Sequence, residues 1–162
     1  MSSFLSAAER TRLSNYPKDM ENSDLGRFFT LTHADMDMVQ QQQRSDYNRL
    51  GFALQLSSLR YLGFIPDNLL DPPPEIVRLL AYQLKLNSEV LNNYGEREQT
   101  RSDHLRQIMA FLGFRRATPI DLMELEAWLA DRALEHDDSN FLLLTALDRL
   151  RWDSIVRPGL ST

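Results

Sequence analysis

Apolar residues along this chain recur every three or four positions, and the long segments lack the period-two alternation of a half-buried strand. Polar residues that can cap helices precede most of the apolar segments, namely Ser6, Ser23, Thr32, Ser88, Thr118 and Asp138 or Ser139. The pattern and its caps predict helices at about 7–13, 24–29, 33–42, 45–62, 74–86, 89–94, 98–112, 119–135 and 139–152. We therefore expect an all-α protein with the apolar helix at 45–62 in its centre.

A proline-rich segment divides the predicted helices. IPDNLLDPPPE contains four of the seven prolines and predicts a linker. We expect tandem helix-turn-helix-like bundles of three to four helices at 1–66 and 67–117. A helical pair at 118–162 follows, as the start of a further domain of a longer protein.

An internal repeat supports the two bundles. A shift of 55 residues aligns the segment 24–44 with 79–97, each a short apolar helix, a tight connection and a capped second helix. Gly26 then corresponds to Ala81, so a small residue is expected where two helices cross. This spacing predicts a helix-turn-helix, although a plain helical hairpin would have the same pattern.

The second helix of each copy offers candidate base-reading side chains. Met36 with Val39, and Leu91 with Tyr94, are predicted to face inward. The opposite faces then present Gln41 and Gln42 in the first copy, and Asn92 and Asn93 in the second. Such amides can pair with adenine in the major groove, whereas glutamines are also simply good helix formers.

Basic residues follow each second helix and are candidate phosphate contacts. The set comprises Arg44, Arg49, Arg60, Arg97, Arg101, His104, Arg115 and Arg116. Arg97, Arg101 and His104 are spaced four and three apart, as on one helical face. That face predicts phosphate binding, or alternatively a solvated surface that pairs with neighbouring carboxylates.

The amino-acid composition excludes several kinds of functional site. The 162 residues include 18 Lys+Arg, 23 Asp+Glu and no cysteine, so disulfides, thiolate metal sites and a cysteine nucleophile are excluded. The three histidines lack metal-ligand spacing, no segment is long and apolar enough to span a bilayer, and we expect no cofactor. The net charge of -5 opposes nucleic-acid binding, but residues 40–64 and 94–116 are locally basic whereas 117–140 are strongly acidic.

Several strings of the chain resemble one protein family. RSDYNRLGFALQLSSLRYLGF (44–64), preceded by LTHADMDMV, looks like the N-terminal region of Tn-three-type replicative transposases. YGEREQTRSDHLRQIMAFLGFR (94–115) and RWDSIVRPGLST (151–162) match the same family in the same order. The resemblance implies sequence-specific binding of double-stranded DNA at terminal inverted repeats, with the catalytic acidic triad downstream. It also implies, as partners, the other domains of the transposase and a second copy of the full-length protein, in the bacterial cytoplasm and at the nucleoid when DNA is bound.

The residues alone are also compatible with two other functions. Arg97 and His104 have a spacing that resembles the Arg–His pairs of HEPN-like RNases, in which the histidine is the acid–base group. The helix LMELEAWLADRAL has an apolar stripe of Leu122, Leu125 and Leu129, extended by Trp128, that serves either a core or a protein-interaction module.

Overall fold

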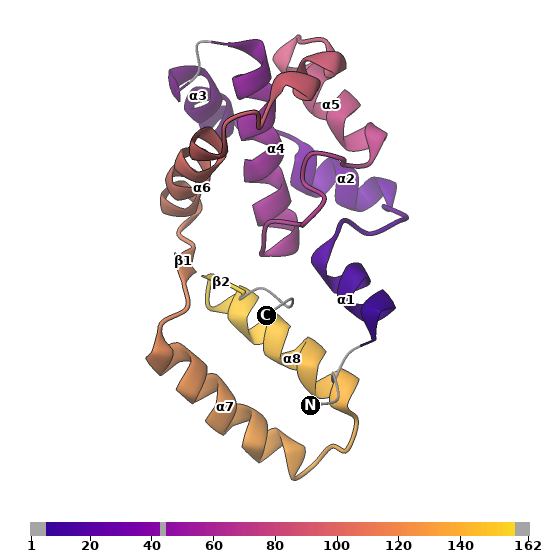
Figure 1. The fold of residues 1–162 in the computed structure, drawn as a ribbon, viewed down its shortest axis with the longest axis vertical. Helices are drawn as coiled ribbons and strands as arrows, with labels where there is room; N and C mark the ends of the chain where they lie inside the picture. The colour runs from indigo at the N-terminus through magenta and orange to yellow at the C-terminus, as the bar shows by residue number, and fades with distance from the viewer. Residues whose placement is uncertain (1–5, 43–44, 158–162) are drawn as a thin grey trace. The chain divides into compact units, whose positions relative to one another are not determined.

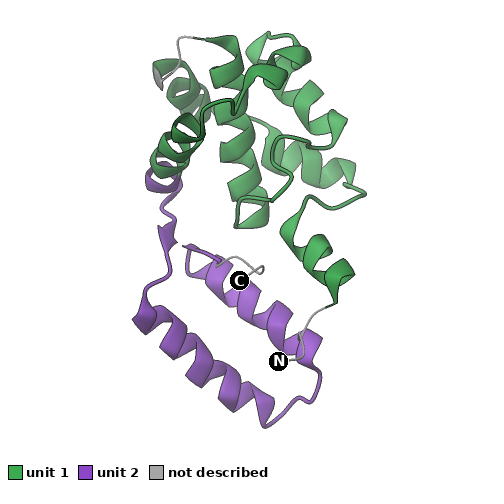
Figure 2. Ribbon diagram, viewed as in Figure 1, with its two compact units in different colours: residues 1–108, 160–162 green, residues 109–159 purple. Residues whose placement is uncertain are grey.

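The computed structural model describes residues 6–42 and 45–157, and these form two compact units (Figure 2). The described residues up to Ile108 make the first unit, and those from Met109 make the second. Helices dominate both units (Figure 1), so the prediction of an all-α fold is confirmed. The first unit contains α1 (Ala7–Ser14), α2 (Asn22–Phe29), α3 (His33–Gln42), α4 (Asp46–Leu62), α5 (Pro74–Leu84), the 3₁₀ helix η1 (Ser88–Asn93) and most of α6 (Glu98–Leu112).

Helix α4 is the centre of the first unit, as its apolar sequence predicts. Every residue from Leu50 to Leu59 is buried, and α4 contacts α2, α3, α5 and η1. A helix that is buried around its whole circumference must have neighbours on all sides. Gly63 ends it in the left-handed conformation, with φ of 76°, where a glycine has no Cβ to clash.

The predicted division into bundles at 1–66 and 67–117 differs from this arrangement. α4 precedes the proline-rich segment, yet it packs against α5 and η1, which follow that segment. The segment is also fastened to the start of the chain. Asp67 N donates to Ser14 O at 2.7 Å, and Tyr16 N donates to Asn68 Oδ1 at 3.0 Å. The prolines therefore end helices without separating domains, because the apolar faces on both sides share one core.

The second unit is a helical pair with a short parallel bridge. It contains β1 (Arg115–Arg116), α7 (Pro119–Ala133), α8 (Ser139–Trp152) and β2 (Ile155–Val156). The pair agrees with the helices predicted from residue 118, but the unit begins earlier than predicted, within α6. Arg115 pairs with Ile155 and Arg116 with Val156. Two-residue strands have no detectable period, which is why the sequence did not predict them.

Most of the predicted caps form. Ser6 and Thr118 make capping boxes with Glu9 and Asp121, and Asp138 caps α8. Two caps are displaced, because α2 begins after Glu21 instead of Ser23, and η1 is capped by Asn87 instead of Ser88.

Candidate nucleic-acid interface

The α2–α3 connection has the tight geometry that the repeat predicts. Thr30 to Thr32 join the helices, and Gln83 of α5 holds this turn from outside. Leu31 N donates to Gln83 Oε1 at 2.7 Å, and Gln83 Nε2 donates to Phe29 O at 2.8 Å. One side chain that lies 52 residues away from Leu31 in sequence therefore bonds to two backbone groups at this connection.

Helix α3 is oriented as its apolar pair predicts. Val39 is fully buried and Met36 is half-buried, while Asp37 and Gln41 are exposed. Gln41 therefore lies on the side that an external partner can reach. The side chain of Gln42 and the whole of Arg44 lie outside the described residues, so both remain predictions.

The start of α3 is fixed by a buried carboxylate. Asp35 is 1% exposed, and its Oδ2 accepts from Thr32 N at 2.9 Å in a reciprocal cap. Arg60 reaches the same carboxylate with both terminal nitrogens, at 2.6 and 2.9 Å. Burial alone would raise the pKa of Asp35, but the hydrogen bonds from Arg60 and Thr32 hold it below its ordinary value. Arg60 is therefore a structural residue, which corrects its prediction as a phosphate contact.

The second copy departs from the first at its second helix. Leu91 and Tyr94 are buried and Asn92 and Asn93 exposed, as predicted. The six residues of η1, however, form a 3₁₀ helix instead of an α-helix. Two adjacent asparagines have poor helix propensity and bond well to nearby backbone, which favours the short tight helix. The repeat therefore predicted which side chains are exposed but not the type of helix that carries them.

The predicted basic face of α6 lies partly in the core. His104 is 5% exposed, and its Nδ1 lies 2.8 Å from the Tyr94 hydroxyl. Gln55 Nε2 of α4 donates to that hydroxyl at 2.6 Å. Burial lowers the pKa of His104, which keeps the ring neutral, and raises the pKa of Tyr94 to about 12. His104 is thus a packed core residue, which corrects its prediction as a phosphate contact and disfavours an acid–base role.

A polar hollow lies beside this network, where the starts of α4 and α6 meet the end of η1. Its volume is about 270 Å³, and its lining includes Asn48, Asn93, Arg97 and Thr100, with Tyr47, Gly95 and Glu96. Arg97 and Asn93 are both exposed. The structure therefore brings a predicted phosphate contact and a predicted base reader to one concave surface.

Arg49 and Arg101 have different surroundings. Arg49 is half-buried and forms an ion pair with Asp46 on the first turn of α4. Arg101 is also half-buried, and its Nε has no hydrogen-bond partner among the described residues. A Cβ on Gly95, which lines the hollow, would come within 3.2 Å of Arg101 Cδ. Arg101 therefore lies next to the hollow, whereas Arg49 is engaged by its neighbour.

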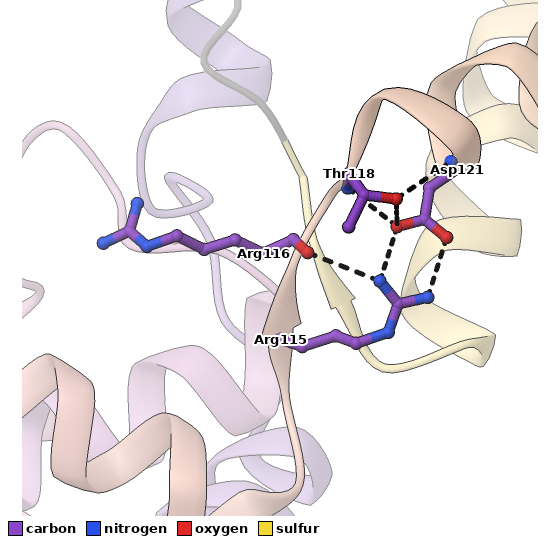
Figure 3. A network of polar contacts seen from close by, with 4 residues as sticks. All are labelled: Arg115, Arg116, Thr118 and Asp121. Carbon is purple, nitrogen blue, oxygen red and sulfur yellow. Dashed lines mark hydrogen bonds and ion pairs between the residues drawn. The ribbon is translucent and has the colours of Figure 1, made fainter.

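Arg115 and Arg116 belong to the second unit and differ from each other (Figure 3). Arg115 forms a bidentate pair with Asp121, with its two terminal nitrogens 2.5 and 2.8 Å from the carboxylate oxygens. Those hydrogen bonds hold the pKa of Asp121 well below its ordinary value. The side chain of Arg116 extends away from this network in Figure 3 and is exposed. Arg116 is available to an anion, whereas Arg115 is already engaged.

Sequence reasoning missed two kinds of residue. Tyr47, Asn48 and Thr100 line the hollow, yet each is a lone polar or aromatic residue at a helix start and gives no distinctive signal. Gln55 was detectable in principle, because it is a polar residue inside a continuously apolar helix and is 1% exposed.

Metal-binding clusters and membrane-spanning helices were both sought among the described residues. No group of three or more His, Cys, Asp or Glu within the described ranges is arranged to hold a metal ion. None of the described helices is long and apolar enough to cross a membrane.

Comparison with known proteins identifies relatives along nearly the whole chain. A family model described as a domain of unknown function (DUF4158) matches residues 4–162. The transposase for transposon Tn21 of Escherichia coli is 37% identical over 161 residues, and the transposase for transposon Tn1546 of Enterococcus faecium is 31% identical over 159 residues. The transposase for transposon Tn501 of Pseudomonas aeruginosa is 32% identical over 158 residues.

These matches cover 98% of this chain but only 16% of each of those relatives. The resemblance to Tn-three-type transposases drawn from the sequence strings is thereby confirmed. The chain belongs to the DUF4158 family and is related to the N-terminal part of Tn3-family transposases.

Proposed function

We propose that this chain binds double-stranded DNA specifically at the terminal inverted repeats of a transposon, as the DNA-binding N-terminal part of a transposase. The whole protein then carries out DNA transposition, in the bacterial cytoplasm and at the nucleoid when bound to DNA. In this proposal the present region needs no cofactor and performs no catalysis. The strand-transfer chemistry is left to other domains of the same polypeptide.

The observation that carries the proposal is the polar hollow of the first unit. Its volume, about 270 Å³, is ample for a phosphate group, and Arg97 supplies a cation at its wall. Asn48, Asn93 and Thr100 supply neutral donors beside that cation. Glu96 also lines the hollow and repels phosphate, so it is better placed to accept from an amino group of a base.

In this proposal, helices α2 and α3 provide a second surface that contacts the DNA. Gln41 lies on its exposed side, and the turn before it is rigidly held by Gln83. A reading helix has to be fixed to its own bundle, because an amide selects a base only when its two hydrogen bonds are both in register. The net charge of -5 is compatible with this function, since the acidic residues concentrate at 117–140, in the second unit.

The RNase alternative has less support. His104 would have to reach the ribose and the phosphate of an RNA, but it is buried and bonded to Tyr94. An acid–base group must lie within hydrogen-bond reach of the proton that it moves.

The interaction-module alternative has one specific observation in its favour. Every residue of α7 keeps exposed surface, and several large apolar side chains of the second unit are exposed. A role of this kind is compatible with DNA binding, because the polar hollow and the exposed apolar residues of α7 belong to different units.

The decisive experiment is a fluorescence-anisotropy titration of two labelled duplexes, one with the element's own terminal repeat and one scrambled. It is run at about 50 and 200 mM salt, where counterion release separates phosphate contacts from other interactions. We expect tighter binding to the terminal repeat. In the Arg97→Ala variant both duplexes should lose affinity alike, and the log–log salt slope should fall by roughly one.

Arg106→Ala is the matched control. Arg106 is exposed on α6, is paired with Asp103 and does not line the hollow. Its removal changes the net charge by the same amount as the removal of Arg97. Equal effects of the two substitutions would mean that only net charge matters at Arg97. Equal binding of both duplexes by the unaltered chain would refute the proposed specificity.

A further inference from the structure

Helix α7 has two opposite apolar faces. Leu125, Trp128 and Leu129 are half-buried on the face toward α8, and Arg149 of α8 lies 4.8 Å from the centre of a Trp128 ring. The other face carries a second set of apolar residues, here called the outer seam, which comprises Ile120, Met123, Ala127 and Ala130, with Leu134 at the C-cap of the helix. All five are exposed, with Ile120 at 67%, Met123 at 68% and Leu134 at 87%.

The spacing of the outer seam is that of a helix–helix contact. Its members are separated by three, four, three and four residues, which is the spacing of a and d positions over two heptads. On an α-helix they fall within a stripe about 80° wide. The two alanines in the middle leave room for a partner backbone to approach closely, with larger side chains at both ends.

Both flanks of the outer seam are acidic. Glu124 and Asp131 border it on one side, and Glu126 borders it on the other. A second copy of α7 docked on this stripe would bring carboxylates against carboxylates, in either orientation, and like charges at these positions oppose pairing. The complementary partner is an amphipathic helix with an aliphatic stripe between Lys or Arg residues.

The length of the relatives indicates where that helix comes from. The chain corresponds to 16% of the length of its transposase relatives, so most of the polypeptide of each relative has no counterpart in this structure. We propose that the outer seam of α7 is the docking site for a basic-flanked amphipathic helix from another region of the same transposase. This inference rests on the chain being part of a transposase, but not on its binding to DNA.

The first test measures whether the seam is covered in the full-length transposase. Ala127→Cys places a thiol in the middle of the seam, and Ser139→Cys places one at an exposed control position on α8. Alkylation at each site is followed by peptide mass spectrometry, without DNA, in the 162-residue chain and in the full-length protein. We expect alkylation at residue 127 to slow about tenfold in the full-length protein, which equals about 1.4 kcal/mol of protection. The rate at residue 139 should be unchanged.

Equal rates at residue 127 in the two proteins would overturn the proposal. So would protection at residue 127 that appears in the isolated chain as its concentration rises, because that result identifies a second copy as the occupant. Neither result depends on DNA. The anisotropy titration therefore tests the proposed DNA binding separately from the docking of the outer seam.

The second test examines the chemistry of the occupant. Two synthetic helical peptides share Leu at every a and d position, and differ in having Lys or Glu at the flanking positions. We expect the isolated chain to bind the Lys peptide and not the Glu peptide, and Ala127→Gln to abolish that binding. Comparable affinity for the Glu peptide, or unchanged binding by the Ala127→Gln variant, would overturn the assignment.

Discussion

Arg60, near the end of α4, places both terminal nitrogens on the carboxylate of Asp35, in the first turn of α3. Asp35 also accepts from the backbone of Thr32, immediately before α3. One buried carboxylate therefore fixes where α3 begins and ties that point to the central helix. The exposed side of α3, which includes Gln41, takes its direction from this contact.

Arg60→Ala should destabilise the protein strongly. The substitution leaves the Asp35 carboxylate buried without its cationic partner, and breaking a pair of this kind costs about 3–5 kcal/mol. Arg106→Ala removes an exposed arginine that pairs with Asp103, and it should cost no more than about 1 kcal/mol. Urea denaturation of the two variants measures both effects. Equal stabilities would show that the Asp35–Arg60 pair contributes no more than a surface pair.

Gly51→Ala and Gly26→Ala should change stability in opposite directions. A Cβ on Gly51 would overlap the ring of Tyr94, whereas a Cβ on Gly26 meets nothing within 4 Å. We expect Gly51→Ala to cost about 1–3 kcal/mol by overpacking, and Gly26→Ala to add about 0.5–1 kcal/mol by raising helix propensity. Thermal melts of the two variants test this, and a neutral Gly51→Ala would contradict the close approach of Tyr94.

Gly26 and Gly51 also show a limit of what can be predicted from the sequence. The repeat placed a close helix crossing at Gly26, but Gly26 is exposed and the close approach occurs at Gly51. Gly51 lies within the motif NRLGFALQL, one residue after the buried Leu50. Periodicity identifies a helix and its buried face, but it does not show which neighbour lies against that face.

Local features of the fold were predictable and long-range polar contacts were not. Thr32 and Thr118 were identified as caps because a cap depends on residues within one turn. Arg60 was assigned to phosphate because its partner Asp35 lies 25 residues away. A side chain that finds its partner only after folding looks, in the sequence, like an available surface charge.

The buried ring of His104 predicts a loss of stability under mildly acidic conditions. Burial lowers its pKa from the ordinary 6.5, and the nearby Asp103 opposes this only in part. The unfolded chain therefore binds a proton more readily than the folded protein as the pH falls through about 6.5, which favours unfolding. Free energies of unfolding measured at about pH 7.5 and 5.5 should show a decline that is smaller in His104→Gln. The same decline in both proteins would assign the effect to other groups.

Base discrimination should reside in the exposed amides Gln41, Asn92 and Asn93, together with Gln42. Asn93 lines the polar hollow together with Arg97, the arginine that holds a phosphate in the proposed function. Loss of one bidentate pair should cost about 1–3 kcal/mol of affinity for the terminal repeat and almost nothing for scrambled DNA. Anisotropy titrations of Gln41→Ala, Asn92→Ala and Asn93→Ala against both duplexes measure this difference.

The control for the amide variants is Val39→Ala, on the inner side of α3. Val39 is fully buried, so its truncation should leave a cavity and lower the melting temperature. The variants of the exposed amides should have the melting temperature of the unaltered chain. An amide variant that loses affinity for both duplexes equally, without a change in melting temperature, acts on phosphate and does not read bases. If all three amide variants behave in that way, Arg101 becomes the best remaining candidate for reading bases, because its side chain lies next to Gly95 of the hollow.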